Sequence, residues 1–410
     1  MVPNGWKPCA LADITKWSSG GTPSKSNSDY WGGDIPWISA ASMRGHYFSS
    51  SELAITELAV SEKAKMAEQG TLLLLVRGSM LWNKIPVGIT TRRLAFNQDV
   101  KCLTPISNKL DILFLLYWFL AKENKLMGMV TGTGIGAGKL DTNDLQSLDV
   151  FLPPLPEQRK IAKILSTWDK AISTTERLID NSKQQKKALM QQLLTGKKRL
   201  LDDSGKPFEG EVQNFKLGDI SKMNSGGTPK SSVEEYYGGE IPWVSIADMT
   251  KHGKWISSTG KYLTKAGVEN SSARLYSAGT VLYAMYASIG ECSISTVELA
   301  SSQAILGIRP SSILSNIYLY YFLGNLKEKI TLMGQQGTQS NLNAGMVKDF
   351  KISLPSLVEQ QKIAAVLTNA DKEIDLLEQQ LADLKQEKKA LMQQLLTGKR
   401  RVSLNIKEDL

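Results

Sequence analysis

Apolar residues recur with a seven-residue period in two long stretches of the chain, residues 155–200 and 357–402. In each stretch a second row follows four positions after the first, which is the spacing of the a and d positions of a coiled coil. Gly196 and Gly398 follow the last apolar positions, as is typical of helix ends. The pattern predicts two long helices that pair with each other. The rows of the second stretch are Ile363, Ala370, Leu377, Leu384 and Leu391, followed by Leu367, Ile374, Leu381, Lys388 and Leu395.

The seam of the first stretch is less regular than that of the second. Thr175 and Ser182 stand in one of its rows and weaken it. Lys186 and Lys388 occupy the same core-edge position in the two stretches, where a lysine costs stability and can fix the register of a helix pair. Two surface helices of separate domains would show a similar period, but two matching seams in one chain favour mutual pairing.

A second repeat precedes each of these stretches. Residues 20–43 read GGTPSKSNSDYWGGDIPWISAASM and residues 226–249 read GGTPKSSVEEYYGGEIPWVSIADM, an offset of 206 residues. Gly-Gly-Thr-Pro is typical of a turn, and Ile-Pro-Trp indicates an edge strand that begins at a proline. A purely structural role and a DNA contact are both open for this unit, and Lys25 and Lys230 in the turn favour contact. The chain is therefore a duplicated unit.

Beyond this repeat the two halves diverge in sequence and in spacing. Between a few surviving anchors, β-rich apolar runs such as 71–76 and 281–286 alternate with basic or polar loops. An apolar helix expected at Ile112–Ala121 has its counterpart at Ile317–Leu323. We expect one scaffold that carries two different surfaces. The anchors are His46 with His252, Gly70 with Gly279, Gln98 with Gln303, and Pro105 with Pro310.

The composition is that of a soluble globular protein, with 410 residues and 42% hydrophobic content. The longest apolar run is shorter than the ~18 residues of a membrane span, and the N-terminus shows no signal-peptide pattern. Cys9, Cys102 and Cys292 are too far apart for a metal-binding pair and odd in number, which fits a reducing cytoplasm. The net charge of +9 suggests a polyanionic partner, although a basic protein without such a partner would carry the same charge.

Catalytic constellations are missing from the sequence. The only two histidines stand at equivalent positions of the two halves, so no His pair, triad or HExxH motif forms within one half. The segment TGTGIGAGKLDTNDLQ departs from a phosphate-binding loop, because Leu140 follows Lys139 and Thr133 replaces the first glycine. A flexible loop that leads into the next helix is the better interpretation, and Lys139 on it could approach a DNA phosphate. We therefore expect a protein that reads a partner rather than one that reacts with it.

With these repeats, the sequence resembles a specificity subunit of a type I restriction-modification system over essentially all of its 410 residues. One motif that carries the resemblance is GGTPSKSNSDYWGGDIPW with its repeat GGTPKSSVEEYYGGEIPW. The other is LPPLPEQRKIAKIL with its repeat LPSLVEQQKIAAVL, each followed by a long helix. Both motifs occur twice and in alternating order, and the weakened first seam is the departure from the pattern.

The resemblance implies an α+β fold with a pseudo-two-fold internal repeat. Two β-rich α/β target recognition domains would be separated by two long helices that form an antiparallel coiled coil. The recognition domains would span residues 1–152 and 201–354, and the helical spacer regions residues 153–200 and 355–410. The implied partners are double-stranded DNA, two modification (methyltransferase) subunits and the restriction (motor-nuclease) subunits. This chain would be non-catalytic, cytoplasmic, unattached to a membrane and without a cofactor, while S-adenosylmethionine, ATP and Mg²⁺ are expected on the partners.

Antiparallel pairing would set the two recognition domains at opposite ends of the helices. A helix of about 38 residues at ~1.5 Å each is roughly 57 Å long. At ~3.4 Å for each base pair, that length corresponds to something like 15 base pairs. We therefore expect a bipartite, asymmetric DNA site with one half-site for each domain and a spacer set by the helices.

Basic side chains on the divergent loops are the best physical candidates for DNA contacts. Arginine can form two hydrogen bonds with guanine, and both arginine and lysine bind phosphate. A solvated loop charge is the alternative for most of them. Tyr286 falls near Arg77 in the alignment of the repeats, so we expect the halves to differ there in what they recognise. The candidates are Lys25, Arg44, Arg77, Lys84, Arg92, Arg93, Lys139, Lys230, Lys251, Lys254, Lys261, Lys265, Arg274 and Tyr286.

Three other interpretations stay open at this point. A self-contained nuclease or methyltransferase is disfavoured by the missing motifs. A coiled-coil scaffold without a DNA role would explain the helices but not two divergent basic domains. The specificity chain of a related restriction system, in which modification and cleavage share one partner polypeptide, would have the same sequence features.

Overall fold

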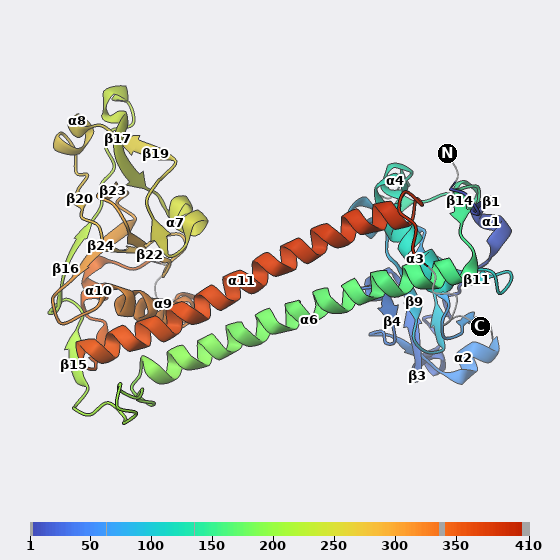
Figure 1. Cartoon of the computed structure of the whole chain (residues 1–410), viewed down its shortest axis with the longest axis horizontal. Coiled ribbons are helices and arrows are strands. Elements are labelled where there is room, and N and C mark those ends of the chain that lie inside the picture. The colour runs from blue at the N-terminus through green and yellow to red at the C-terminus, as the bar shows by residue number, and fades with distance from the viewer. Residues whose placement is uncertain (1–2, 63, 135, 336–340, 404–410) are drawn as a thin grey trace. The chain divides into compact units, whose positions relative to one another are not determined.

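The computed structural model describes residues 3–62, 64–134, 136–335 and 341–403, and the chain divides into two compact units (Figure 1). Unit 1 combines Met1–Glu176 with Gln380–Leu410, and unit 2 is Arg177–Gln379. Each unit therefore holds one β-rich domain together with parts of both long helices. Residues 404–410, which belong to the second helical region expected from the sequence, lie outside the described residues.

The two long helices are α6 (Leu155–Leu193) and α11 (Leu357–Leu395), with 39 residues each. They pack against each other in an antiparallel direction, which the ion pairs between them show. In unit 1, Asp169 pairs with Lys388 at 2.5 Å, and one heptad later Glu176 pairs with Lys385 at 2.8 Å. The partner number falls along α11 as the residue number rises along α6. The pairing predicted from the heptads and the antiparallel direction implied by the resemblance are both confirmed.

The predicted seam is the buried stripe of these helices. Ile161 and Leu165 are fully buried, and Ile179 nearly so, while Leu376 off the seam is 72% exposed. Thr175, expected to weaken the seam, is itself buried, and its hydroxyl donates a hydrogen bond to the Ala171 carbonyl of its own helix at 3.0 Å. The threonine therefore leaves no unsatisfied polar group in the seam.

The domain of unit 1 is built on two mixed sheets. The five-stranded sheet has the order β2 (Thr15–Ser19), β11 (Val100–Pro105), β7 (Leu72–Leu75), β9 (Val87–Thr90) and β4 (Tyr47–Phe48). The four-stranded sheet has the order β5 (Ala54–Ile55), β3 (Trp31–Ile38), β10 (Leu94–Phe96) and β6 (Met66–Ala67). The remaining elements are β1 (Lys7–Ala10) paired with β14 (Asp149–Leu152), the sheet β12 (Thr131–Gly132), β13 (Gly138–Lys139) and β8 (Arg77–Gly78), and the helices α1 (Leu11–Ile14), η1 (Ser28–Tyr30), η2 (Ala40–Ser42), α2 (Glu57–Glu62), η3 (Ser79–Trp82), α3 (Ile112–Ala121), α4 (Glu123–Gly128) and α5 (Thr142–Gln146).

The core of unit 1 explains its most apolar sequence runs. Strand β7 consists of four leucines, and all are fully buried because the strand lies in the middle of its sheet. Helix α3 packs against the same sheet at β9 and joins the same hydrophobic cluster. The expectation that Ile112–Ala121 forms a buried core helix is confirmed.

Unit 2 repeats the five-stranded sheet, the four-stranded sheet and the two-stranded pair of unit 1, but its described residues hold no counterpart of the sheet β12-β13-β8. Its five-stranded sheet has the order β16 (Ser221–Ser225), β24 (Ile305–Pro310), β21 (Val281–Ala284), β22 (Cys292–Ser295) and β18 (Trp255–Ile256). Its four-stranded sheet has the order β19 (Lys261–Leu263), β17 (Tyr237–Val244), β23 (Leu299–Ser301) and β20 (Leu275–Tyr276). The remaining elements are β15 (Gln213–Lys216) paired with β25 (Lys351–Leu354), and the helices η4 (Glu234–Tyr236), α7 (Ile246–His252), α8 (Lys265–Glu269), α9 (Asn316–Gln335) and α10 (Ala344–Lys348). The duplication read from the sequence is a duplication of the fold.

The strand expected to begin at a proline is different in the structure. Strand β3 begins at Trp31 and is an inner strand of its sheet, with Pro36 near its end. Its parallel pairing with β10 involves only Trp37 and Ile38, after the proline. On the other side, the N–H of Trp37 donates to the Leu53 carbonyl at 2.9 Å. Pro36 is tolerated inside the sheet because no ladder bond requires its missing N–H.

The register of the sheets corrects one anchor of the sequence alignment. The His46 carbonyl accepts a hydrogen bond from Ile89 N–H at 2.9 Å, and the Lys254 carbonyl accepts one from Ile294 N–H at 2.7 Å. Lys254, and not His252, is therefore the counterpart of His46. The shift arises because unit 2 has a full helical turn, α7, where unit 1 has the shorter helix η2.

Candidate nucleic-acid interface

The repeated Gly-Gly-Thr-Pro and Ile-Pro-Trp motifs are packed against each other. The Trp37 indole N–H donates to the Gly21 carbonyl at 3.0 Å, and Trp243 donates to the Gly227 carbonyl at the same distance. A Cβ atom on Gly20 would lie 2.0 Å from the Phe96 carbonyl oxygen, so only glycine fits there. These residues have a structural role, while Lys25 and Lys230 of the same turns are exposed.

Replacing Gly20 with alanine is expected to destabilise unit 1 by about 3 kcal/mol, because the new Cβ atom must push backbone apart in a packed site. Gly32 is the matched control. It has a φ of +83° but open space around it, so alanine there carries only the cost of the left-handed backbone, roughly 1–2 kcal/mol. Thermal unfolding of the two variants measures the difference. Equal shifts in Tm would contradict the close approach.

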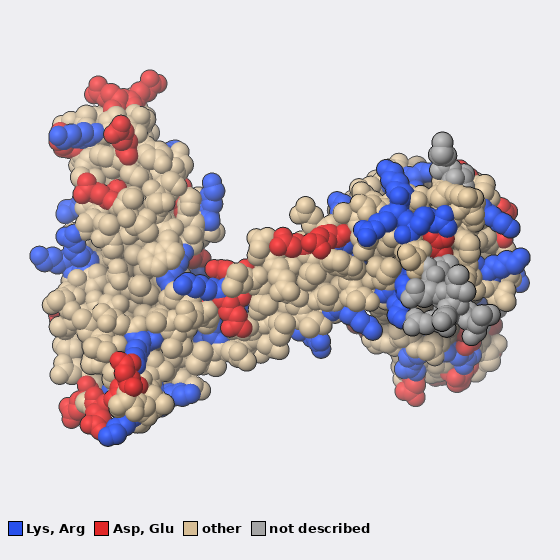
Figure 2. Space-filling view, in the orientation of Figure 1, with Lys and Arg blue, Asp and Glu red and all other residues tan. Residues whose placement is uncertain are grey.

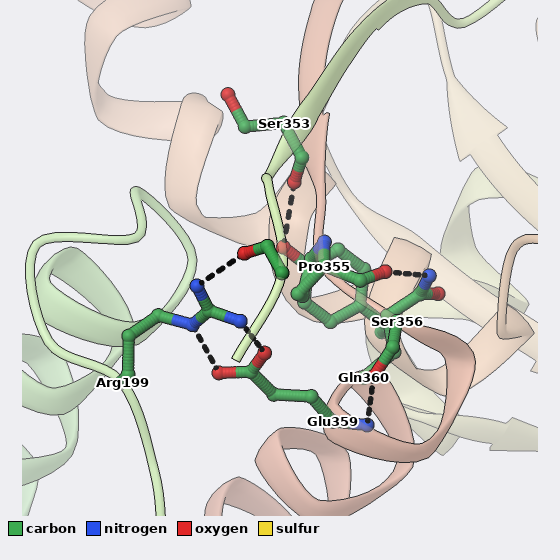
Figure 3. A network of polar contacts seen from close by, with 8 residues as sticks. Arg199, Ser353, Pro355, Ser356, Glu359 and Gln360 are labelled. Carbon is green, nitrogen blue, oxygen red and sulfur yellow. Dashed lines mark hydrogen bonds and ion pairs between the residues drawn. The ribbon is translucent and has the colours of Figure 1, made fainter. Parts of the chain in front are cut away.

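The second repeated motif holds the ends of the two long helices. Glu359 is buried near the start of α11 and accepts two hydrogen bonds from the Arg199 guanidinium, at 2.8 and 2.6 Å (Figure 3). This pairing raises the pKa of Arg199. In unit 1, Glu157 and Arg401 form the same two bonds at 2.6 and 2.7 Å. Each unit thus connects the start of one long helix to the segment that follows the other.

The glutamine next to each of these glutamates joins the helix to its domain. The Gln360 side chain donates to the Pro355 carbonyl at 3.0 Å (Figure 3). It also donates to the Ile313 carbonyl at 2.9 Å and accepts from Ser315 N–H at 2.9 Å. Gln158 makes the same set of bonds in unit 1. A buried amide with satisfied donors and acceptor fixes the geometry of the helix start. The motifs that carry the family resemblance are therefore scaffold.

A further network connects each domain to the middle of the helices. The Tyr117 hydroxyl donates to the Asp169 carboxylate at 2.6 Å, and Lys388 pairs with the same carboxylate. Burial and this bond raise the pKa of Tyr117, so the phenol keeps its proton. In unit 2, Tyr321, Asp371 and Lys186 repeat the arrangement.

One predicted DNA-contact residue belongs to this network. The Lys254 ammonium contacts Tyr321 and Thr368 at 2.7 and 3.0 Å and lies 3.7 Å from Asp371. Its side chain is only 11% exposed, and desolvation lowers the pKa of Lys254 while Asp371 opposes the shift. Lys254 was expected on a divergent, DNA-facing loop, but its charge is held inside the protein, so we leave it out of the proposed contacts.

Two other predicted residues are brought together. The segment 131–139 was expected to be a flexible loop, but β12 and β13 form a hairpin that extends to β8. Arg77 on β8 stands directly opposite Lys139 on β13. Residues in this register point to the same face, so both charges share one surface. The exposed Trp82 ring lies next to it and donates to the Gly136 carbonyl at 3.1 Å.

Unit 2 carries a different residue at the equivalent place. Val281 pairs with Ile294 as Leu72 pairs with Ile89, so Tyr286 is the counterpart of Arg77. The sequence alignment predicted this correspondence correctly. Tyr286 is exposed and precedes Ala287, which has a positive φ of 59°. Two residues after the shared strand, unit 1 therefore presents a guanidinium and unit 2 a phenol.

The other predicted residues are exposed but scattered around the domains. Arg93 lies 3.8 and 3.5 Å from the carboxylates of Glu57 and Glu68, and Lys265 pairs with Glu269 within α8. Both are partly neutralised by these surface pairs. The others on loops, turns or element ends are Arg44, Lys84, Arg92, Lys251, Lys261 and Arg274.

The described residues include neither a metal-binding cluster nor a membrane-spanning helix. No group of three or more His, Cys, Asp or Glu side chains in that part of the chain could hold a metal ion. No helix among the same residues is long and apolar enough to cross a membrane.

The sequence analysis did not include Trp82 among the candidate DNA-contact residues. An aromatic residue between Arg77 and Lys84 was nevertheless a usable signal for a nucleic-acid surface.

The comparisons with known proteins agree with this architecture. The family described as "Type I restriction modification DNA specificity domain" matches residues 3–182 and 209–386. A putative type I restriction enzyme MjaX specificity subunit from Methanocaldococcus jannaschii is 26% identical over 98% of this chain and 95% of its own. The EcoR124I/EcoR124II specificity subunit from Escherichia coli is 32% identical over 40% of each chain.

Solved structures share the fold at low sequence identity. The crystal structure of a type I restriction-modification S subunit from M. genitalium has a TM-score of 0.57 at 15% identity, covering 99% of this chain and 100% of the other. A chain from a study of complex assembly and conformational transition of the type I system has a TM-score of 0.64 at 18% identity, covering 98% and 100%. The chain described here belongs to the type I restriction-modification DNA specificity family.

Proposed function

We propose that this chain is the DNA sequence-recognition subunit of a type I restriction-modification complex. The domain of each unit reads one half of a bipartite, asymmetric site, and the long helices set the unread spacer between the halves. The observation that carries this proposal is that the two units share their buried motifs but differ in their exposed residues. The duplicated motifs are used inside the scaffold, whereas the exposed residues at equivalent positions differ, as Arg77 and Tyr286 do.

The surface around β8 and β13 is the first candidate for base recognition in unit 1. Arg77 and Lys139 lie opposite each other on the paired strands β8 and β13, and a pair of strands can enter the major groove. An arginine there favours a guanine in the half-site, and the lysine supports it with a phosphate contact. Tyr286 in unit 2 offers a phenol instead, so the second half-site differs.

The chain directs chemistry that its partners perform. We infer that it is non-catalytic, that two modification subunits methylate adenine and that restriction subunits cleave the DNA in the cytoplasm. S-adenosylmethionine, ATP and Mg²⁺ belong to those partners. In this scheme residues 1–152 and 201–354 recognise DNA, while 153–200 and 355–410 form the spacer and hold the partners.

Methylome sequencing tests the proposal directly. The chain is expressed with the modification subunit encoded beside it, and the methylated motifs are compared with those of a strain that lacks the chain. N6-methyladenine in a two-part motif with a fixed spacer is the expected result. If the modification subunit co-purifies but no new motif appears, the recognition role is wrong and a scaffold role takes its place.

Single substitutions should separate the two half-sites. Arg77→Ala is expected to weaken binding by about 1–3 kcal/mol and to relax the sequence requirement of the first half-site only. Tyr286→Ala is the matched variant and should change only the second half-site. Motif sequencing for both variants measures this. A change in both halves from one substitution would contradict the assignment of one half-site to each unit.

A further inference from the structure

Unit 2 contains a large basic cavity where its domain meets the long helices. The cavity has a volume of about 890 Å³. Seven of its lining residues are lysines, whereas only three are acidic. The lining residues come from α6 and the segment after it, from residues 252–255 between the end of α7 and the start of β18, from α9 and from α11, so the cavity depends on the way the domain is joined to the helices. Among the residues that line this cavity, only Lys254 was predicted from the sequence as a DNA contact.

Internal ion pairs leave part of this charge uncompensated. Lys183 pairs with Glu378 at 2.7 Å, and Asp371 holds two further lysines of the network described above. Within the described part of the chain, Lys197, Lys329 and Lys372 make no ion pair, and all three are exposed. The cavity therefore presents surplus positive charge to solvent, which calls for an anionic ligand.

Unit 1 has lysines at most of the positions equivalent to these. Six of the seven lining lysines have a lysine at the equivalent position, and the seventh, Lys254, corresponds to His46. Lys125, Lys170 and Lys399 are the counterparts of the three exposed lysines, and they are exposed as well. Lys and Arg side chains gather over α4 and the end of α11 in unit 1 (Figure 2). The basic cluster is thus a repeated feature.

A repeated cluster between divergent domains points to a ligand that is the same at both half-sites. The DNA backbone has this property, because phosphates carry the same charge at every sequence. Lysine suits it as a mobile point charge that binds phosphate without a fixed geometry. A protein partner is the other ligand that recurs, but lysine is depleted in protein interfaces.

We propose, on the basis of the recognition function, that the exposed lysines of the two clusters bind DNA phosphates on the spacer side of each half-site. These lysines are Lys197, Lys329 and Lys372 in unit 2 and Lys125, Lys170 and Lys399 in unit 1. They supply affinity that does not depend on sequence, while the divergent loops supply specificity. The spacer side follows from their construction, because both clusters include the long helices that we propose to span the spacer. Trp255 lines the cavity of unit 2, and its counterpart in unit 1 is Tyr47, which is likewise about half exposed.

The test uses the full chain in complex with its modification subunits. Lys197, Lys329 and Lys372 are replaced together by glutamine, and binding is measured by fluorescence anisotropy on a duplex with the methylated motif and on one without it. We expect the salt slope to fall by roughly 0.9 for each phosphate that the variant no longer neutralises, and both affinities to fall by a similar factor, on the order of tenfold or more. Replacing Lys125, Lys170 and Lys399 of unit 1 together by glutamine should lower the salt slope and both affinities in the same way.

A matched control removes the same charge elsewhere in unit 2, through glutamine at Lys206, Lys222 and Lys351, which are exposed and outside the cavity. Neutral methylphosphonate linkages on the spacer side should weaken binding by the wild-type complex but not by the cavity variant. Affinities and salt slopes equal to those of the control would overturn the proposal. So would loss of the modification subunit from the variant, with unchanged DNA binding by the complex that still assembles. A wild-type complex without preference for the motif would instead refute the recognition function.

Discussion

Replacing Arg199 with alanine is expected to lower the free energy of unfolding of unit 2 by about 3 kcal/mol. Its partner Glu359 is 1% exposed, so the substitution leaves a buried carboxylate without a counter-charge. The pair is bidentate, with bonds at 2.8 and 2.6 Å, and the guanidinium is partly exposed, which puts the loss at the lower end of the range for buried pairs. For a unit of this size, the thermal transition should move down by roughly 6–12 °C.

Two further variants show whether the orphaned charge causes the loss. Lys216→Ala removes one partner of an exposed pair with Asp349 at 2.8 Å, and the thermal transition should move far less, because solvent screens this pair. Adding Glu359→Gln to Arg199→Ala should restore part of the stability, because a neutral amide is cheaper to bury than an unpaired carboxylate. Calorimetry of the full chain measures all three. A double variant less stable than Arg199→Ala would exclude this explanation.

The long helices were predictable because their stability depends on a local period. A heptad row is visible in the sequence whatever lies on its far side, and the burial of Ile161, Leu165 and Ile179 follows it. Thr175 shows the limit of this reasoning. Its hydroxyl is satisfied within its own helix, and composition alone does not reveal that.

Features that depend on long-range pairing were harder to predict. The inner position of β3 depends on β5 and β10, which are far apart in the sequence, and Pro36 misled the assignment. The bond between Arg199 and Glu359 joins residues 160 positions apart, so no local sequence motif predicts it. Each repeated motif was found, but its role as scaffold needed the contacts.

The candidate site was predictable in composition but not in arrangement. Exposed basic residues on divergent loops were identified from the sequence. The pairing of Arg77 with Lys139, however, depends on a hairpin in a glycine-rich segment that was predicted to be a loop. Lys254 shows the reverse case, because it lies on a turn as the sequence suggested, but its side chain is only 11% exposed. The sequence shows that Lys254 is charged, but its exposure to solvent could be known only from the packing of α9 and α11 around it.

Inserting one heptad into both long helices is expected to lengthen the spacer of the methylated motif by about three base pairs. Seven residues add roughly 10.5 Å to a helix at ~1.5 Å each, and a base pair spans ~3.4 Å. A whole heptad keeps the seam in phase, so the helices can still pair. Insertions after Glu176 and after Gln379 fall between the two units and leave their ion pairs intact.

Three additional base pairs also rotate one half-site relative to the other by roughly a third of a turn, since B-DNA has about 10.5 base pairs per turn. Methylation of the longer motif should therefore be less efficient than that of the original, and the original motif should disappear. A heptad in α6 alone is the control. The register of Asp169 with Lys388 in unit 1 and that of Lys183 with Glu378 in unit 2 cannot then both be kept, so this insertion should destabilise the chain without creating a new motif. If both helices are lengthened and methylome sequencing still finds the original spacer, the helices do not measure the distance between the half-sites.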